Sequence, residues 1–202
     1  LFRSLRDTAN LNMRGGKMML RSDGNTDQTE TVGAINLEWG NSEIRLQPAS
    51  GYTYTLASGA ALSRTNYATA LVASPDLGGS AGGSGSGRIT FPSAPAMIGG
   101  GGAAGSTEVS IIPYLVGGTS TNASDLLIGD MGSTFVTYDS GTSSLRTLNT
   151  STEFASAVGG SSSTTNVRKT GGETLAANAS INALILDRAA AGSNFTIDGP
   201  HT

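Results

Sequence analysis

Two segments of this chain repeat the same pattern, and the repeat limits the possible folds more than any single residue does. The first comprises residues 32–38 and, after a polar break, 44–46; the second comprises 181–187 and 195–197. Alternate residues are apolar in each segment, which is the period of a β-strand with one buried face. The repeat predicts stacked strand–turn–strand units, with Leu184 and Leu186 pointing inward and residues 181–202 as the start of a further unit.

The rest of the chain also favours short strands. Apolar alternation bounded by Gly, Asn, Asp, Ser or Pro occurs at 11–13, 19–20, 35–39, 44–46, 52–56, 88–91, 109–111, 135–138, 181–186 and 195–197. One helical turn or two is predicted over 150–158, because Phe154 and Val158 are four residues apart and Thr150 or Ser151 would cap it. The expected class is all-β.

Composition excludes several classes of protein. Only 13% of the residues are charged and the net charge is −3, whereas a typical globular enzyme carries charge on about a quarter of its residues. The regular apolar alternation argues against disorder. Cysteine is absent, so neither disulfides nor thiolate metal sites are available. No apolar run approaches roughly 18 residues, the length that a membrane helix needs. Because the chain begins without Met and stops just after a strand pattern, we expect it to be part of a longer polypeptide.

A Gly/Ser-rich stretch at 78–87 interrupts the pattern, and four glycines follow at 99–102. This composition fits either a domain boundary or a long surface loop. Strand-like runs of the same character lie on both sides, and neither half has the pattern of a core that closes alone, so a loop is favoured. We therefore predict a single β-solenoid segment over residues 1–202 with an irregular loop at 78–87.

Several segments resemble a known family. Residues 29–37, 88–95, 134–139 and 144–148 resemble, in order and spacing, the bacterial autotransporter-associated β-strand repeat proteins, over about residues 15 to 202. The resemblance implies a right-handed parallel β-helix, export to the bacterial cell surface and a stalk or scaffold role in a very long chain. It implies no catalytic residues. The sequence departs from the family pattern in its Gly/Ser-rich loop and at 117–122, so the loop geometry stays open.

The sequence contains few groups of residues that could form a catalytic site. The single histidine is His201, at the end of the chain, which argues against Ser-His-acid chemistry and His-based zinc sites. Asp125, Asp130 and Asp139 form the one acidic stretch where a carboxylate pair could cleave glycans or calcium could bind. Each also has the sequence context of a turn-closing Asp. We predict no enzyme activity and no catalytic, cofactor-binding or metal-binding residues, and leave calcium near Asp125 to Asp139 open.

The sequence also argues against nucleic acid and phosphate as ligands. Glycine patterns such as 82–87 follow from the 29 glycines and lack the Lys-Ser/Thr ending of a phosphate loop. The start of the chain is mildly basic, but Asp7 and Asp23 dilute it and the sequence pI is about 5.0. The basic residues concerned are Arg3, Arg6, Arg14, Lys17 and Arg21.

Two interpretations fit the aromatic residues. They would either form a flat platform for sugar rings or cover a face of the solenoid, and the second reading is favoured. These residues are Trp39, Tyr52, Tyr54, Tyr67, Tyr114 and Tyr138. A cluster on one outer face would favour glycan binding, and two carboxylates about 5–9 Å apart in a groove would favour an enzyme.

The sequence as a whole predicts a structural or surface-display scaffold segment of a secreted bacterial protein. Its expected partners are further copies or segments of the same chain, stacked end to end on the solenoid. A carbohydrate-binding or adhesive module, with a glycan as partner, is the alternative. A polysaccharide-cleaving β-helix enzyme ranks third. No nucleic acid partner and no membrane span are expected.

Overall fold

The computed structural model describes residues 5–22, 24–79, 84–119, 134–187 and 196–198. Within these residues the regular structure is entirely β-strand, without a helix, so the prediction of an all-β chain is confirmed. The chain divides into two compact units. Unit 1 comprises Leu1–Ala96 and Ile112–Thr147, and unit 2 comprises Met97–Ile111 and Leu148–Thr202. The prediction of one continuous segment over residues 1–202 stays a prediction.

Unit 1 begins with nine strands that form three parallel sets. In chain order the first, fourth and seventh strands pair in parallel, as do the second, fifth and eighth and the third, sixth and ninth. The bounds are β1 (Leu11–Arg14), β2 (Lys17–Arg21), β3 (Gln28–Val32), β4 (Ile35–Trp39), β5 (Asn41–Gln47), β6 (Thr53–Ser58), β7 (Ser63–Arg64), β8 (Thr69–Ala73) and β9 (Ser86–Thr90). The chain therefore passes three times through the same succession of three sets of parallel strands.

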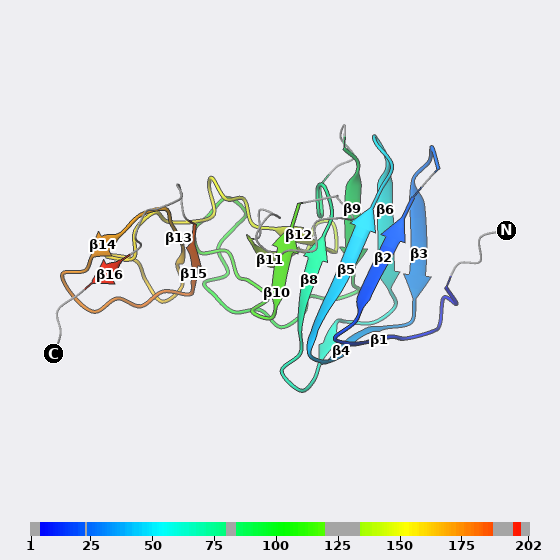
Figure 1. Ribbon diagram of the computed structural model, residues 1–202, viewed down its shortest axis with the longest axis horizontal. Coiled ribbons are helices and arrows are strands. Elements are labelled where there is room, and N and C mark those ends of the chain that lie inside the picture. Colours follow the sequence, from blue (N-terminus) through cyan, green and yellow to red (C-terminus); the bar gives the residue numbers. More distant parts are fainter. Residues whose placement is uncertain (1–4, 23, 80–83, 120–133, 188–195, 199–202) are drawn as a thin grey trace. The chain divides into compact units, whose positions relative to one another are not determined.

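The last three strands of unit 1 close this arrangement with mixed pairing. β10 (Leu115–Gly118) pairs in parallel with β8 and antiparallel with β11 (Thr134–Asp139). β12 (Ser144–Thr147) then pairs antiparallel with both β11 and β9. The result is one nine-stranded sheet in the order β2-β5-β8-β10-β11-β12-β9-β6-β3, in which β2, β5, β8 and β10 lie side by side (Figure 1).

This mixed sheet corrects the prediction of parallel pairing throughout. The chain between β11 and β12 has only four residues, from Ser140 to Ser143. A parallel connection needs a dozen or more residues, whereas a short turn joins antiparallel neighbours. The local turn therefore decided the pairing of these strands.

The core of unit 1 lies on the inner faces of these strands. In β4, Ile35 and Leu37 are fully buried, while Asn36 and Glu38, which alternate with them, are only half-buried. Each fully buried aliphatic side chain stabilises the fold by about 1.5–3 kcal/mol relative to an exposed one. The core also includes Val32, Leu46, Leu56, Val72, Ile89, Val136 and Leu145.

Unit 2 contains four short strands in two parallel pairs. β13 (Asn166–Lys169) pairs with β15 (Ala183–Leu186), and β14 (Glu173–Thr174) pairs with β16 (Ile197–Asp198). The second copy of the sequence repeat thus forms strands, as predicted. Its burial differs from that of the first copy, however, because Leu186 is 56% exposed whereas Leu37 is 1% exposed. The expected inward orientation of Leu186 is wrong.

Two further predictions in unit 2 are wrong. Residues 150–158 form turns instead of a helix, because the side chain of Asn149 accepts the backbone N–H of Ser151 at 2.9 Å and fixes a turn there. Residues 109–111 form no strand; Ile111 makes only an isolated bridge to Ile98.

The predicted loop at 78–87 is shorter than expected in unit 1. β9 begins at Ser86, and Gly87 forms a bridge with Leu77. The Ser86 hydroxyl is buried and lies 2.8 Å from both the Asp76 and the Gly79 carbonyl oxygens. Residues 80–83 of this stretch lie outside the described residues.

Candidate functional site

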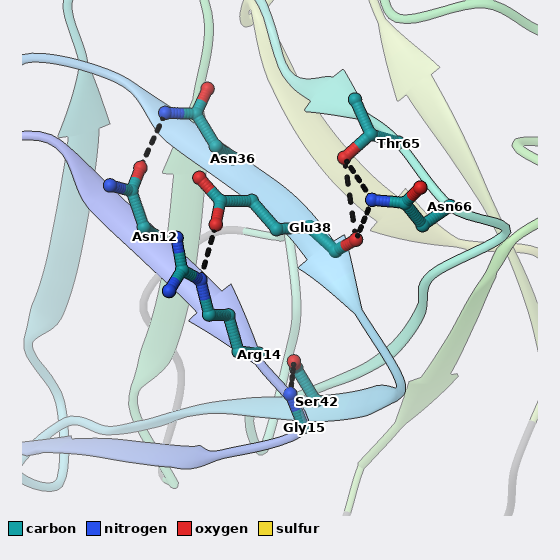
Figure 2. Close-up of polar contacts among 8 residues, drawn as sticks. All are labelled: Asn12, Arg14, Gly15, Asn36, Glu38, Ser42, Thr65 and Asn66. Carbon is teal, nitrogen blue, oxygen red and sulfur yellow. Dashed lines mark hydrogen bonds and ion pairs between the residues drawn. The ribbon is translucent and has the colours of Figure 1, made fainter.

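The outer face of the β1-β4-β7 sheet carries a ladder of polar side chains (Figure 2). The Asn36 Nδ2 donates to Oδ1 of Asn12 at 2.7 Å, and the Ser63 hydroxyl donates to Oδ1 of Asn36 at 2.6 Å. The three residues are register partners on parallel strands, which places their side chains one above another. Their hydrogen bonds link successive strands, so the ladder has a structural role.

Ion pairs continue this cross-strand pattern. Arg14 on β1 pairs with Glu38 on β4 at 2.5 Å (Figure 2). Lys17 on β2 pairs with Glu43 on β5 at 2.9 Å, and the same carboxylate accepts Arg45. Two of the basic residues near the start of the chain, Arg14 and Lys17, are therefore each paired with an acidic residue on the adjacent strand of the sheet.

The corner between β7 and β8 differs from the corresponding corners of the preceding strands. Gly15 follows β1 at φ 79° and Gly40 follows β4 at φ 64°. After β7, two residues with side chains adopt this left-handed conformation instead, Asn66 at φ 49° and Tyr67 at φ 56°. Non-glycine residues rarely do so, and two in succession give the geometry of a type I′ turn.

Hydrogen bonds to the neighbouring strand hold this corner in place. The Thr65 Oγ1 and the Asn66 Nδ2 both donate to the carbonyl oxygen of Glu38, at 3.3 and 3.0 Å (Figure 2). The Ala68 N–H closes the turn on the Thr65 carbonyl at 3.0 Å. The corner is therefore fixed by contacts of its backbone and of its polar side chains.

The six aromatic residues considered as a sugar platform are not all exposed. Tyr54 and Tyr114 are buried, and the Tyr138 hydroxyl donates to the Phe91 carbonyl at 2.9 Å. Burial raises the pKa of Tyr54, and the Glu30 carboxylate adds to this effect. Tyr52 is half-buried. The two exposed members are Trp39 at 57% and Tyr67 at 90% exposure, so the platform is reduced to these two rings.

Arg64 connects one of these exposed rings to a buried one. Its guanidinium carbon lies 4.8 Å from the ring centre of Tyr114 and 6.0 Å from that of Tyr67. Its Nε also donates to the Ala68 carbonyl at 2.7 Å. Stacking on aromatic rings is a typical use of arginine, and here it supports the turn that carries Tyr67.

The acidic residues predicted from the sequence do not form a catalytic pair within the described part of the chain. Asp139 accepts the Gly141 N–H at 2.8 Å and closes the turn after β11. Asp125, Asp130 and His201 lie outside the described residues. Among the residues that are described, no group of three or more His, Asp or Glu side chains could hold a metal ion. The same residues include no helix of the length and hydropathy that crossing a bilayer requires.

Two carboxylates in unit 2 have structural roles that sequence reasoning missed. Glu153 is buried and accepts the N–H groups of Gly105 at 2.8 Å and Asn149 at 2.7 Å. It thereby joins two loops that are distant in sequence. No local pattern in the sequence marks this residue, because Gly105 lies 48 positions away from it.

Glu173 joins loops in a similar way. It accepts the N–H groups of Val158 at 2.9 Å and Gly159 at 2.8 Å, and it pairs with Lys169 at 3.1 Å. The Val158 N–H, then the Gly159 N–H and then Lys169 lower the pKa of this carboxyl group. An ionised carboxylate with two backbone donors fits a staple between loops better than a proton-transfer group.

No family model matches this sequence, and neither curated proteins nor solved structures give a match.

Proposed function

We propose that this chain is a structural or surface-display scaffold segment of a secreted bacterial protein, built on a right-handed parallel β-helix. The observation that carries the proposal is the threefold succession of parallel strands in unit 1. Asn12 pairs with Asn36, 24 positions on, and Asn41 pairs with Thr69, 28 positions on. Strand connections between parallel neighbours are right-handed in about 98% of cases, which supports the proposed hand.

The use of polar side chains supports a scaffold role. On the β1-β4-β7 face, Asn12, Asn36 and Ser63 bind one another, and Arg14 pairs with Glu38. Such cross-strand pairs each stabilise a sheet by about 0.2–1 kcal/mol. The outer face of these strands thus contributes to holding successive strands together.

Stacking of further copies or segments of the same chain is the proposed mode of assembly. β1, β2 and β3 each lie at the end of their sheet among the described strands. An edge strand offers N–H and C=O groups to another strand, and additional units of the same kind would pair with it. The resemblance to autotransporter-associated repeats points to the same arrangement and to the bacterial surface.

Pairs of introduced cysteines test the β-helix, because the sequence contains no native cysteine that would compete for cross-linking. Asn36→Cys with Ser63→Cys should form a disulfide under mild oxidation, since these register partners occupy adjacent strands about 4.8 Å apart. Asn12→Cys with Ser63→Cys is the matched control, because two strand spacings exceed the limit of about 7 Å. Equal cross-linking of both pairs, or of neither pair, would contradict the proposed stacking.

Surface display is tested on intact cells of the organism that produces the chain. Protease added from outside should release peptides of this chain within minutes, while a cytoplasmic protein of the same cells stays intact. Release of these peptides only after the cells are broken would rule out the display role.

A further inference from the structure

Trp39 and Tyr67 are the large aromatic side chains that the described part of unit 1 leaves in solvent. They originate from neighbouring backbone segments. Thr65 donates its N–H to the Leu37 carbonyl and Thr69 donates its N–H to the Gly40 carbonyl, both at 2.9 Å. In the chain, Trp39 lies between the two acceptor residues and Tyr67 lies between the two donor residues. Backbone hydrogen bonds therefore join the two segments on both sides of these aromatic residues.

Tyr67 has a left-handed backbone conformation, which glycine adopts more readily than any other residue. Asn36 pairs with Ser63, 27 positions on, but Asn41 pairs with Thr69, 28 positions on. One extra residue is therefore inserted in the corner that carries Tyr67. A tyrosine at φ 56° costs on the order of 1 kcal/mol of strain or more, and at 90% exposure its ring gains little from packing. Strain of this kind without a packing benefit is characteristic of functional positions.

Two asparagines lie close to these aromatic residues in the chain, Asn41 two positions after Trp39 and Asn66 directly before Tyr67. The Asn66 Nδ2 is bonded to the Glu38 carbonyl, whereas its Oδ1 accepts no hydrogen bond from the described residues. Asn41 accepts the Thr69 hydroxyl at 3.0 Å through Oδ1, and its Nδ2 has no described partner. An amide acceptor and an amide donor match vicinal hydroxyl groups on a sugar, and flat aromatic rings match its apolar face.

The charged side chains closest in the chain to Trp39 and Tyr67 already have partners within the protein. Arg14 and Glu38 neutralise each other, and the Arg64 guanidinium lies over the Tyr114 ring. A charged ligand would therefore find no free counter-charge among these residues. We propose that Trp39 and Tyr67, with Asn41 and Asn66, form a binding site for neutral oligosaccharides of hexopyranose units. This site goes beyond the scaffold role and would give the scaffold an adhesive surface.

The test uses the fluorescence of Trp39, which is the single tryptophan of the chain. Cellohexaose, β-1,4-mannohexaose and maltohexaose are titrated separately into the protein. At least one of them should produce a saturable change in emission intensity or wavelength, because the reporter lies in the proposed site. Absence of a saturable response to all three would overturn the proposal.

Substitutions separate binding from folding. Tyr67→Gly should bind the responding oligosaccharide about tenfold more weakly or worse, while its thermal midpoint stays equal or rises, because glycine adopts positive φ without strain. Tyr67→Asn should behave in the same way, since Asn tolerates this conformation. Calorimetric titration of Trp39→Ala should show a similar loss of affinity.

Tyr52→Ala is the matched control, because Tyr52 is a half-buried tyrosine that precedes β6 and lies outside the proposed site. Its affinity should equal that of the unmodified protein. Unchanged affinity in both Tyr67 variants would overturn the proposal, as would an equal loss in Tyr52→Ala.

Discussion

The Nδ2 of Asn36 donates a 2.7 Å hydrogen bond to Oδ1 of Asn12 on the neighbouring parallel strand. Asn36→Ala would remove this bond and the one from Ser63. We expect the free energy of unfolding of unit 1 to fall by about 1–2 kcal/mol, since each bond contributes about 0.5–1.5 kcal/mol. Urea unfolding followed by Trp39 fluorescence measures the change. Thr29→Ala, at an exposed strand position, is the control and should change stability by less than about 0.5 kcal/mol.

Arg64 should stabilise unit 1 through its aromatic contact as well as its charge. Arg64→Ala removes the stacking on Tyr114 and the hydrogen bond to the Ala68 carbonyl. We expect a loss of about 1–2 kcal/mol in urea unfolding. Arg64→Lys keeps the charge but not the planar group, so it should recover less than half of this loss. Full recovery by lysine would show that charge alone matters.

The two copies of the sequence repeat provide a matched pair of leucines. Leu37→Ala should destabilise unit 1 by about 2–5 kcal/mol, because it leaves a cavity in the core. Leu186→Ala should cost less than about 1 kcal/mol, because Leu186 is more than half exposed. Each variant is unfolded with denaturant, and amide hydrogen exchange of residues in the unit that carries the substitution measures the loss of stability. Equal losses would mean that Leu186 is covered in solution.

Glu173 should make the stability of unit 2 depend on acidic pH. Its pKa in the folded chain lies below the ordinary value of 4.5. The ionised form is therefore favoured by folding, and its stabilising effect is present above pH 4.5 and lost as pH falls through the lower folded pKa. An NMR titration of the Val158 and Gly159 amide protons measures this pKa directly.

The matched variant for this titration is Glu173→Gln. It should abolish the shared titration of the two amide signals and lower the thermal midpoint of unit 2 at about pH 7, with little effect at about pH 3. A midpoint lowered equally at both values would contradict the proposed ionic contribution.

Sequence patterns predicted the strands of unit 1 better than their pairing. Alternation in 35–39 and 52–56 identified β4 and most of β6, because one face of each strand is buried. β7, with only Ser63 and Arg64, has no alternation and was not predicted. The antiparallel closure through β11 and β12 depends on a short turn and on contacts distant in sequence, which a local pattern does not encode.

The polar contacts were less predictable than the strands. The turn role of Asp139 followed from its neighbours Ser140 and Gly141. In contrast, the exposure of Tyr67 depends on one inserted residue in a corner, which becomes visible only when the strand register is known. Sequence alternation likewise assigned Leu186 to a core, although alternation alone does not say whether a strand face is covered.

The closure of the nine-stranded sheet has a consequence for the order of folding. Each strand from β1 to β6 pairs in parallel with the strand one circuit further along the chain, whereas Thr90 on β9 pairs with Ser144 on β12 across a much longer stretch. Contacts between residues distant in the chain form more slowly, because a longer loop must close before they form. The parallel strands should therefore assemble first, and the β12–β9 pairing should complete unit 1 as the late, slow step of its refolding.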